Sequence, residues 1–171
     1  VRGKENKQVE FGAKVNKSMV DGISLIDRLS FDAFNEALEL KRSIMLHKER
    51  FGECKQVGVD AIYGTNANRT YMKSKKIFHS LVRKGRASKY EQQEKLLRSQ
   101  LGKERSTALE GSFGTEKNHY GLNKVKARTE PTEIVWILFG IMTANAVKIS
   151  RRRVIKQAPP GKIPKQLEIA A

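Results

Sequence analysis

The stretch VEFGAKVNKSMVDGISLIDRL, residues 9–29, decides how the fold begins. In its first half apolar residues fall at every second position, which is the period of a β-strand; they are Val9, Phe11, Ala13 and Val15. Asp21-Gly22 follows, and this dipeptide is a strong signal for a two-residue hairpin turn. We therefore predict paired strands over residues 9–20 and 23–29.

Outward from this hairpin, the patterns alternate between helix and strand. Residues 33–51 carry apolar side chains at helical spacing, Phe34 among them, with Ser30 or Asp32 as the expected N-cap and Gly52 as the expected end. Further predicted elements are a strand at 57–59, a helix at 66–72, a strand at 77–82, a helix at 90–110, a loop or broken helix at 112–126 and an apolar helix at 134–147. This order predicts one α/β domain.

The apolar run at 134–147 is expected to be a core helix, with Trp136 inside the core. Its fourteen residues fall short of the roughly 20 that a membrane span requires, so no membrane partner is expected. The arginines at 151–153 are either a solvated helix end or a phosphate-binding patch. Residues 158–171 lack periodicity, and we predict a domain over residues 1–150 followed by a basic, disordered tail over 151–171.

The charge of the chain points to a polyanionic partner. It carries 34 basic and 18 acidic residues, a net charge of +16, which is typical of proteins that bind a phosphate backbone. Residues 1–72 have a net charge of +2, whereas residues 73–110 and 111–171 each have +7. The single cysteine, Cys54, excludes a disulfide framework and suits a reducing cytoplasm.

Two acidic residues stand in positions typical of a metal-dependent nuclease. Asp60 ends the short apolar run Val57-Gly58-Val59, and Glu110 closes the predicted helix at 90–110. Phosphodiester cleavage needs charge stabilised on the attacking and the leaving oxygen, which two divalent ions held by carboxylates provide. A two-ion site usually draws on about three acids, and the third is not evident in this sequence.

Three blocks together resemble the C-terminal part of the catalytic domain of bacterial DDE-type insertion-sequence transposases. They are GVDAIYGTNANR around Asp60, LEGSFGTEKNHYGL around Glu110 and TEIVWILFGIMTANA near the end, and the resemblance covers roughly residues 1–150. It implies an RNase H-like fold, a mixed sheet flanked by helices and incomplete at its N-terminus. It also implies metal-dependent strand cleavage and strand transfer, with Mg²⁺ or Mn²⁺ as cofactor.

Carried over by position, Asp60 matches the second acid of the family and Glu110 the third. Lys117 matches a lysine placed near the DNA end, and Tyr63 and Arg69 occupy positions that flank the second acid. The sequence departs from the family where an arginine commonly stands four residues before the glutamate. Ser106 occupies that position here, and Arg105 precedes it.

No residue matches the family's first acid, which lies on an earlier strand. Asp21 falls in the predicted turn, Asp27 late in a strand and Asp32 at a helix cap, so all three have structural interpretations. We therefore expect this polypeptide to lack the first catalytic aspartate, to hold metal only when that aspartate is supplied, and to be inactive alone.

The expected partner is DNA, both transposon ends and target, bound by the cytoplasmic, nucleoid-associated protein. Lys117, Arg69, Arg105, Lys84 and Arg86 are the predicted DNA-binding residues, and a homodimer would bring two ends together. Two alternatives stay open: a non-catalytic basic DNA- or RNA-binding protein, and a nuclease without strand transfer.

Overall fold

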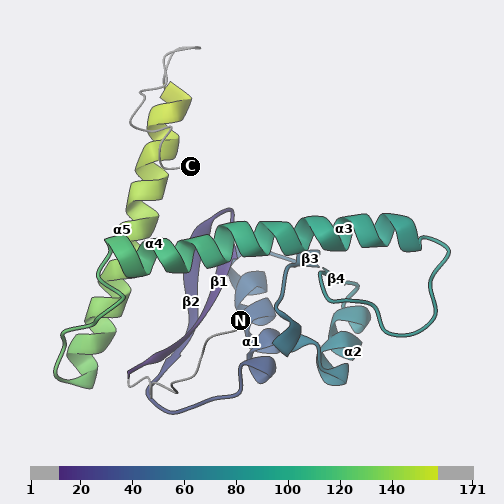
Figure 1. Ribbon diagram of the computed structural model, residues 1–171, viewed down its shortest axis with the longest axis horizontal. Coiled ribbons are helices and arrows are strands. Elements are labelled where there is room, and N and C mark those ends of the chain that lie inside the picture. The colour runs from purple at the N-terminus through teal and green to yellow at the C-terminus, as the bar shows by residue number, and fades with distance from the viewer. Residues whose placement is uncertain (1–11, 158–171) are drawn as a thin grey trace, which may run out of the picture.

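The structure is a computed structural model that describes residues 12–157, a mixed α/β arrangement in which helices predominate (Figure 1). The elements, in chain order, are β1 (Lys14–Val20), β2 (Ile23–Ser30), α1 (Glu36–Phe51), β3 (Gln56–Val57), the 3₁₀ turn η1 (Ala61–Tyr63), α2 (Asn66–Ser74), β4 (Phe78–His79), α3 (Glu91–Glu104), the π-helical turn η2 (Arg105–Glu110), α4 (Gly111–His119) and α5 (Glu130–Gln157). The predicted α/β class is confirmed, and within residues 12–157 the strands form two sheets of two strands each.

The predicted hairpin is present, but its first strand begins at Lys14, and residues 9–11 of the predicted strand lie outside the described residues. Asp21 and Gly22 both have positive φ, 48° and 71°, as a two-residue turn that follows the strand twist requires. The ladder is antiparallel, with a bulge where Asn16 faces Arg28 and Lys17 faces Ile26, which leaves Asp27 without a partner across the strands. Bulges of this kind strengthen the local twist of a hairpin.

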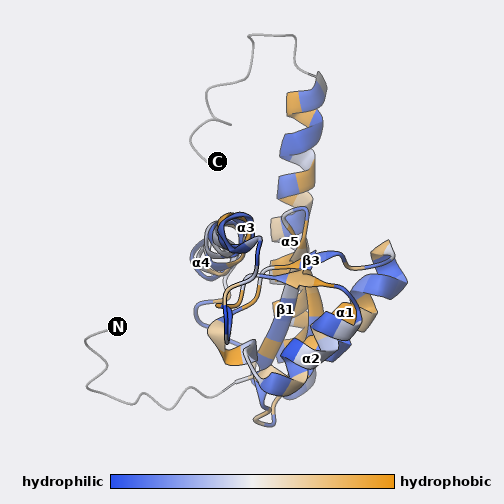
Figure 2. Cartoon of the chain, turned by 90° about the vertical axis from the view of Figure 1, so that its right-hand side faces the viewer, coloured by the Kyte–Doolittle hydropathy of each residue, from blue (hydrophilic) through white to orange (hydrophobic). Residues whose placement is uncertain are grey.

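Helices cover both faces of the hairpin, and Figure 2 shows β1 between the α3–α4 rod and α1. On one face Asn16 donates a hydrogen bond to Ser43 of α1. On the other face Lys17 donates to Ser112 and Glu116 of α4. At the free edge of β2 the side-chain amide of Asn145, in α5, bonds both backbone groups of Ser24, at 2.9 and 2.8 Å. Because successive strand residues point to opposite faces, both Asn16 and Lys17 are buried.

Helix α1 begins later than the sequence predicts. Its N-cap is Asn35, whose side chain accepts a hydrogen bond from Ala37, so the expected caps Ser30 and Asp32 are wrong. Phe34 precedes the helix and does not belong to its apolar face, and Lys14 and Arg28 of the hairpin lie over its ring. Gly52 ends the helix with φ 88°, as predicted.

The main apolar core lies between α1, α2 and the small parallel sheet. Its buried members are Leu40, Ile44, Met72, Ile77 and Leu81. The predicted strand at 77–82 shrinks to β4 because the hydroxyl of Ser80 bonds both backbone groups of Val59, at 2.8 and 3.0 Å. The Ser80 side chain thus makes the bonds to Val59 that a backbone group of a longer β4 would make.

Helices α3 and α4 run together through η2 as one rod across the hairpin (Figure 1). Of the two predictions for residues 112–126, the continued helix holds as far as His119. The rod is amphipathic only weakly, since none of the residues of α3 is buried. Its attachment to the hairpin therefore depends on a few polar contacts from α4.

Helix α5 is twice as long as the predicted apolar helix. It includes residues 151–157, which were predicted to belong to a disordered tail, and Arg152 pairs with Asp21 of the hairpin turn. Residues 158–171, the rest of that predicted tail, lie outside the described residues.

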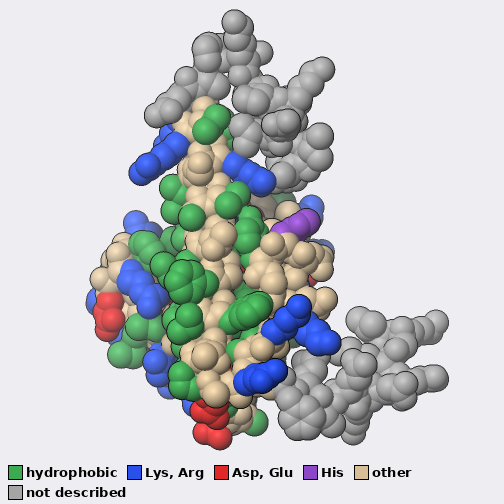
Figure 3. Space-filling view, turned by 90° about the vertical axis from the view of Figure 1, so that its left-hand side faces the viewer, with side chains coloured by type: hydrophobic (Ala, Val, Ile, Leu, Met, Phe, Trp, Pro, Cys, Tyr) green, Lys and Arg blue, Asp and Glu red, His purple; other side chains and the backbone are tan. Residues whose placement is uncertain are grey.

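The prediction of a core helix holds only for one side of α5. Ile137 and Ile141 are buried, whereas apolar side chains along the opposite side, Phe139 among them, are exposed (Figure 3). Trp136 is also partly exposed, with its ring nitrogen donating to the Gly121 carbonyl. By length and hydropathy alone residues 130–156 could cross a membrane, a test that core helices of soluble proteins also pass.

One buried ion pair fastens the rod to the hairpin. The Lys17 ammonium, with 0% of its side chain exposed, donates to both carboxylate oxygens of Glu116 at 2.8 Å, and it also donates to Ser112. Ser24 donates to the same carboxylate, and the Phe113 ring lies 3.8 Å from the ammonium. Burial lowers the pKa of Lys17, and the hydrogen bond and charge of Glu116 oppose that shift.

Replacing Lys17 by Met should lower the free energy of unfolding by about 3–5 kcal/mol, because it leaves the Glu116 carboxylate buried without its partner. Urea unfolding followed by circular dichroism measures the change. Lys48→Met is the matched control, since its pair with Glu53 is mostly exposed and solvent screens it, so it adds little stability. Equal losses in the two variants would contradict this account.

Candidate active site

Asp60 lies just after β3, at the point where the chain turns into η1. Its backbone is extended and its side chain accepts a hydrogen bond from the Ala61 amide, so it is the N-cap of that turn. This is the structural role expected of an isolated aspartate before a helix. The cap uses Oδ1 and leaves Oδ2 directed elsewhere, toward the rod.

Glu110 ends the π-helical turn η2, and Arg105 begins it. A guanidinium nitrogen of Arg105 lies 2.8 Å from Glu110 Oε1, and the other terminal nitrogen lies 3.6 Å from Asp60 Oδ2. One arginine therefore contacts both predicted catalytic acids, which are 50 residues apart in the sequence. The two carboxylates are each 56% exposed, whereas the arginine is 21% exposed.

The π-helical turn accounts for the spacing of Arg105 and Glu110. In an α-helix, neighbours on one face are three or four residues apart, so residues five apart diverge. A π-helix bonds residue i to residue i+5, and this brings Arg105 beside Glu110. In an α-helix the residue four positions before Glu110, which is Ser106, would lie beside it. In this π-helical turn Arg105 lies there instead.

A cleft of about 590 Å³ opens beside these residues, between the hairpin, α1, β3 and the rod. Asp60, Tyr63 and Arg105 line it, together with most of β1. Within the described residues β1 pairs only with β2, and β3 pairs only with β4. The cleft therefore separates two strands that each have an unpaired edge.

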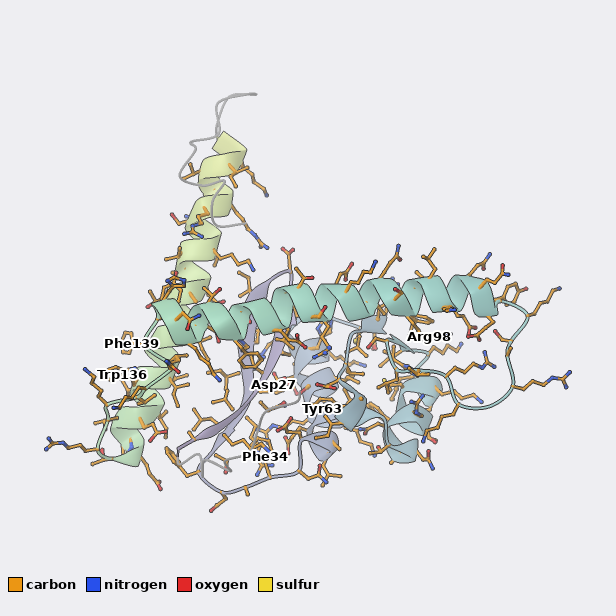
Figure 4. All side chains as sticks on the ribbon, in the orientation of Figure 1. Asp27, Phe34, Tyr63, Arg98, Trp136 and Phe139 are labelled. Carbon is orange, nitrogen blue, oxygen red and sulfur yellow. The ribbon has the colours of Figure 1, made fainter. Side chains whose placement is uncertain are left out.

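Tyr63 connects the site to the hairpin, and Figure 4 shows it beneath the rod in the same region as Asp27. Its hydroxyl donates to the side-chain oxygen of Asn16 at 3.0 Å. Burial raises the pKa of Tyr63 to about 12, and the carboxylates of Glu36, Asp27 and Asp60 add to the shift. The tyrosine is therefore a neutral hydrogen-bond donor at physiological pH.

The predicted DNA-binding residues divide into exposed and internally bonded groups. Lys117 and Arg86 are exposed, and Lys117 follows Glu110 by seven residues along a continuous helix. Lys84 is exposed and bonds Asn66. Arg69 instead donates to the Gly64 carbonyl, and Arg105 contacts the two acids.

The third acid of a two-ion site is not assembled within residues 12–157, where no group of three or more potential metal-binding side chains occurs. Asp21 lies in the hairpin turn, as predicted, and pairs with Arg152. Asp27 is buried beside Arg50 and Ser18, with Oδ2 unbonded. Asp32 is exposed.

The donor set at Asp60 and Glu110 fits one hard divalent ion. Mg²⁺ keeps several waters and is usually held by only one or two carboxylates, and both carboxylates here are exposed enough to retain such waters. A pair of ions would need a further carboxylate. The described residues therefore supply at most two of the about three acids that a two-ion site usually uses.

Sequence reasoning did not predict the side-chain contacts that organise this site. Lys17 reads as an ordinary polar residue of the hairpin, and Ser112 and Glu116 as part of a loop or broken helix; nothing in the pattern joins them. The contact between Arg105 and Glu110 had one signal in the sequence, because both residues stand on one predicted helix. Their spacing of five residues does not predict a contact unless the π-helical turn is known.

Comparisons with family descriptions, with characterised proteins and with solved structures find no match for this chain.

The stability contributed by Tyr63 should depend on pH. Its pKa in the folded protein, about 12, exceeds the value near 10 of an unfolded chain. The contribution is therefore complete below pH 10 and is lost as the pH rises toward 12. Tyr63→Phe should cost about 1 kcal/mol at neutral pH, and the difference from the unmodified protein should shrink between pH 10 and 12.

Thermal unfolding of both proteins across this pH range measures the effect, and their difference removes the shared titration of lysines. Tyr90→Phe is the control, because Tyr90 is 59% exposed. A difference between the unmodified protein and Tyr63→Phe that stays constant up to pH 12 would contradict the assignment.

Proposed function

We propose that this chain is part of a metal-dependent DNA transposase, which cleaves and transfers strands at the ends of an insertion sequence. The observation that carries the proposal is the contact of one guanidinium with both Asp60 and Glu110. It supports the convergence of a strand-end acid and a helix acid, as expected from the blocks in which the two residues stand.

The chemistry assigned to this pair is the binding of a divalent ion by hard oxygen ligands. Such an ion stabilises charge on the oxygens of a phosphodiester during in-line displacement. Asp60 and Glu110 would be its protein ligands. This proposal differs from the expectation drawn from the sequence, because this one ion would bind without the missing aspartate. A second ion, and with it strand cleavage, requires a third carboxylate from outside residues 12–157.

The finer fold that we propose is RNase H-like, with an additional strand between β1 and β3. The cleft between these strands is bounded on both sides by unpaired edges and is lined by residues 15–22 and 56–60. Unpaired edges accept another strand readily. A strand in this cleft would end close to Asp60, which is where a third acid has to lie.

The proposed partner is DNA, and the charge distribution supports it. The net charge of residues 73–171 is +14, and the exposed basic residues Lys84, Arg86 and Lys117 belong to this part. These residues would contact phosphates and contribute affinity without base specificity. The proposal includes a cytoplasmic, nucleoid-associated location and a homodimer that holds two DNA ends.

A non-catalytic nucleic-acid-binding protein is the alternative, and the salt bridges around Arg105 favour it in one respect. Two carboxylates neutralised by an arginine form a complete structural cluster that needs no metal. Both functions predict salt-dependent DNA binding. Divalent metal separates them.

Mn²⁺ should raise the midpoint of thermal unfolding of the 171-residue chain, because a ligand that binds only the folded state stabilises it. Asp60→Asn and Glu110→Gln should each remove this gain. Differential scanning fluorimetry at increasing Mn²⁺ concentration measures it.

Glu49→Gln is the matched control, since Glu49 is an exposed glutamate of α1 far in sequence from both acids. It should leave the Mn²⁺ effect unchanged. The metal site is wrong if Asp60→Asn retains the full gain, and a protein indifferent to Mn²⁺ favours the non-catalytic alternative.

The 171-residue chain should bind duplex DNA without cutting it. Binding should weaken steeply with salt, because phosphate contacts release counterions, whereas residues 12–157 bring no third carboxylate to the site for cleavage. Gel-shift and nicking assays with Mn²⁺ test the two parts. Metal-dependent nicking that Glu110→Gln abolishes would contradict the need for a further acid.

A further inference from the structure

Arg105 is held more firmly than the two acids that it contacts. Its side chain is 21% exposed, compared with 56% for Asp60 and for Glu110. The guanidinium reaches both carboxylates from one side, with its two terminal nitrogens each directed at a different acid. The arginine therefore lies where a cation shared by the two acids would lie.

Two features of the backbone fix this position. The π-helical turn places Arg105 beside Glu110, and Gly58 allows the rod to approach β3 closely. A Cβ atom at Gly58 would lie 2.9 Å from the Leu101 carbonyl oxygen and 3.3 Å from the Arg105 Cβ. Since Gly58 stands two residues before Asp60, this contact sets Arg105 against Asp60.

A guanidinium and a divalent ion compete for the same carboxylate oxygens. Both are attracted by the two negative charges, and they repel each other at contact distance. Without any cation, the two negatively charged carboxylates would repel one another. Arg105 removes that repulsion in the metal-free protein.

We propose that Arg105 is a built-in placeholder cation, which holds Asp60 and Glu110 together in the metal-free state and is displaced when a divalent ion binds. The inference rests on the proposed function, because it concerns the same two acids. It makes Arg105 a positioning residue that tunes metal affinity. Arg105 keeps the two acids in place, and its positive charge lowers their affinity for the divalent ion.

The same helix offers a matched control. Arg98, labelled in Figure 4, contacts two carboxylates as well, those of Glu91 and Glu94. Replacing it removes one of two guanidinium groups from this cluster, since Arg83 also contacts both carboxylates. Arg98→Gln therefore changes the net charge as Arg105→Gln does, without touching the proposed metal ligands.

The experiment is a calorimetric titration of the 171-residue chain with MnCl₂, with circular dichroism to confirm that each variant folds. Arg105→Gln should bind Mn²⁺ roughly tenfold more tightly than the unmodified protein, because a competing positive charge is gone. Arg105→Lys, which keeps the charge, should bind about as the unmodified protein does. Arg98→Gln should also leave the affinity unchanged.

Thermal unfolding provides a second readout. Without metal, Arg105→Gln should unfold at a lower temperature than the unmodified protein, because the two carboxylates then repel each other. With Mn²⁺ it should gain more than the unmodified protein gains. A residue that only supports the fold would lower both midpoints equally.

The outcomes separate the two proposals. Suppose that the unmodified protein binds Mn²⁺ and that Asp60→Asn does not. If Arg105→Gln then binds Mn²⁺ with unchanged or weaker affinity, the placeholder role is overturned and the metal site stands. If Arg98→Gln tightens binding as much as Arg105→Gln, the effect is one of net charge and the role is also overturned. If no variant shows binding that depends on Asp60, both proposals fail.

Discussion

The contact between Lys17 and Glu116 is the interaction on which the rest of the arrangement depends. It is the buried link between the hairpin and the rod, and it places α4 across β1 with little help from apolar packing, since α3 buries no side chain completely. A buried ion pair is a weak source of net stability, but breaking it is costly. In this protein it selects one orientation of the rod, and that orientation brings Glu110 toward Asp60.

The π-helical turn then completes what the ion pair begins. In a regular α-helix, Arg105 and Glu110 would point away from each other, and no single side chain would join the two acids. The additional residue in the turn brings them together, while Gly58 lets the rod lie directly on the strand. π-helical turns occur often at functional sites, and here the irregularity is the feature that assembles the site.

Much of the local structure could be predicted because it follows from short-range rules. Asp21-Gly22 requires a tight turn, Gly52 ends α1, and the spacing of apolar residues defines the helices. The failures have a common cause, which is competition from distant groups. Asn35 is the N-cap in place of Ser30 and Asp32, and directly before it the side chains of Lys14 and Arg28, from the distant hairpin, lie over the Phe34 ring.

Sequence alone determined the order of helices and strands, the excess of positive charge and the choice of Asp60 and Glu110 as candidate acids, because propensity, charge and motif are properties of neighbouring residues. Only the tertiary structure decided that Arg105 contacts both acids, that Lys17 is buried against Glu116 and that a cleft separates β1 from β3. Each of these joins residues that no periodicity relates, so they depend on how the rod packs on the hairpin.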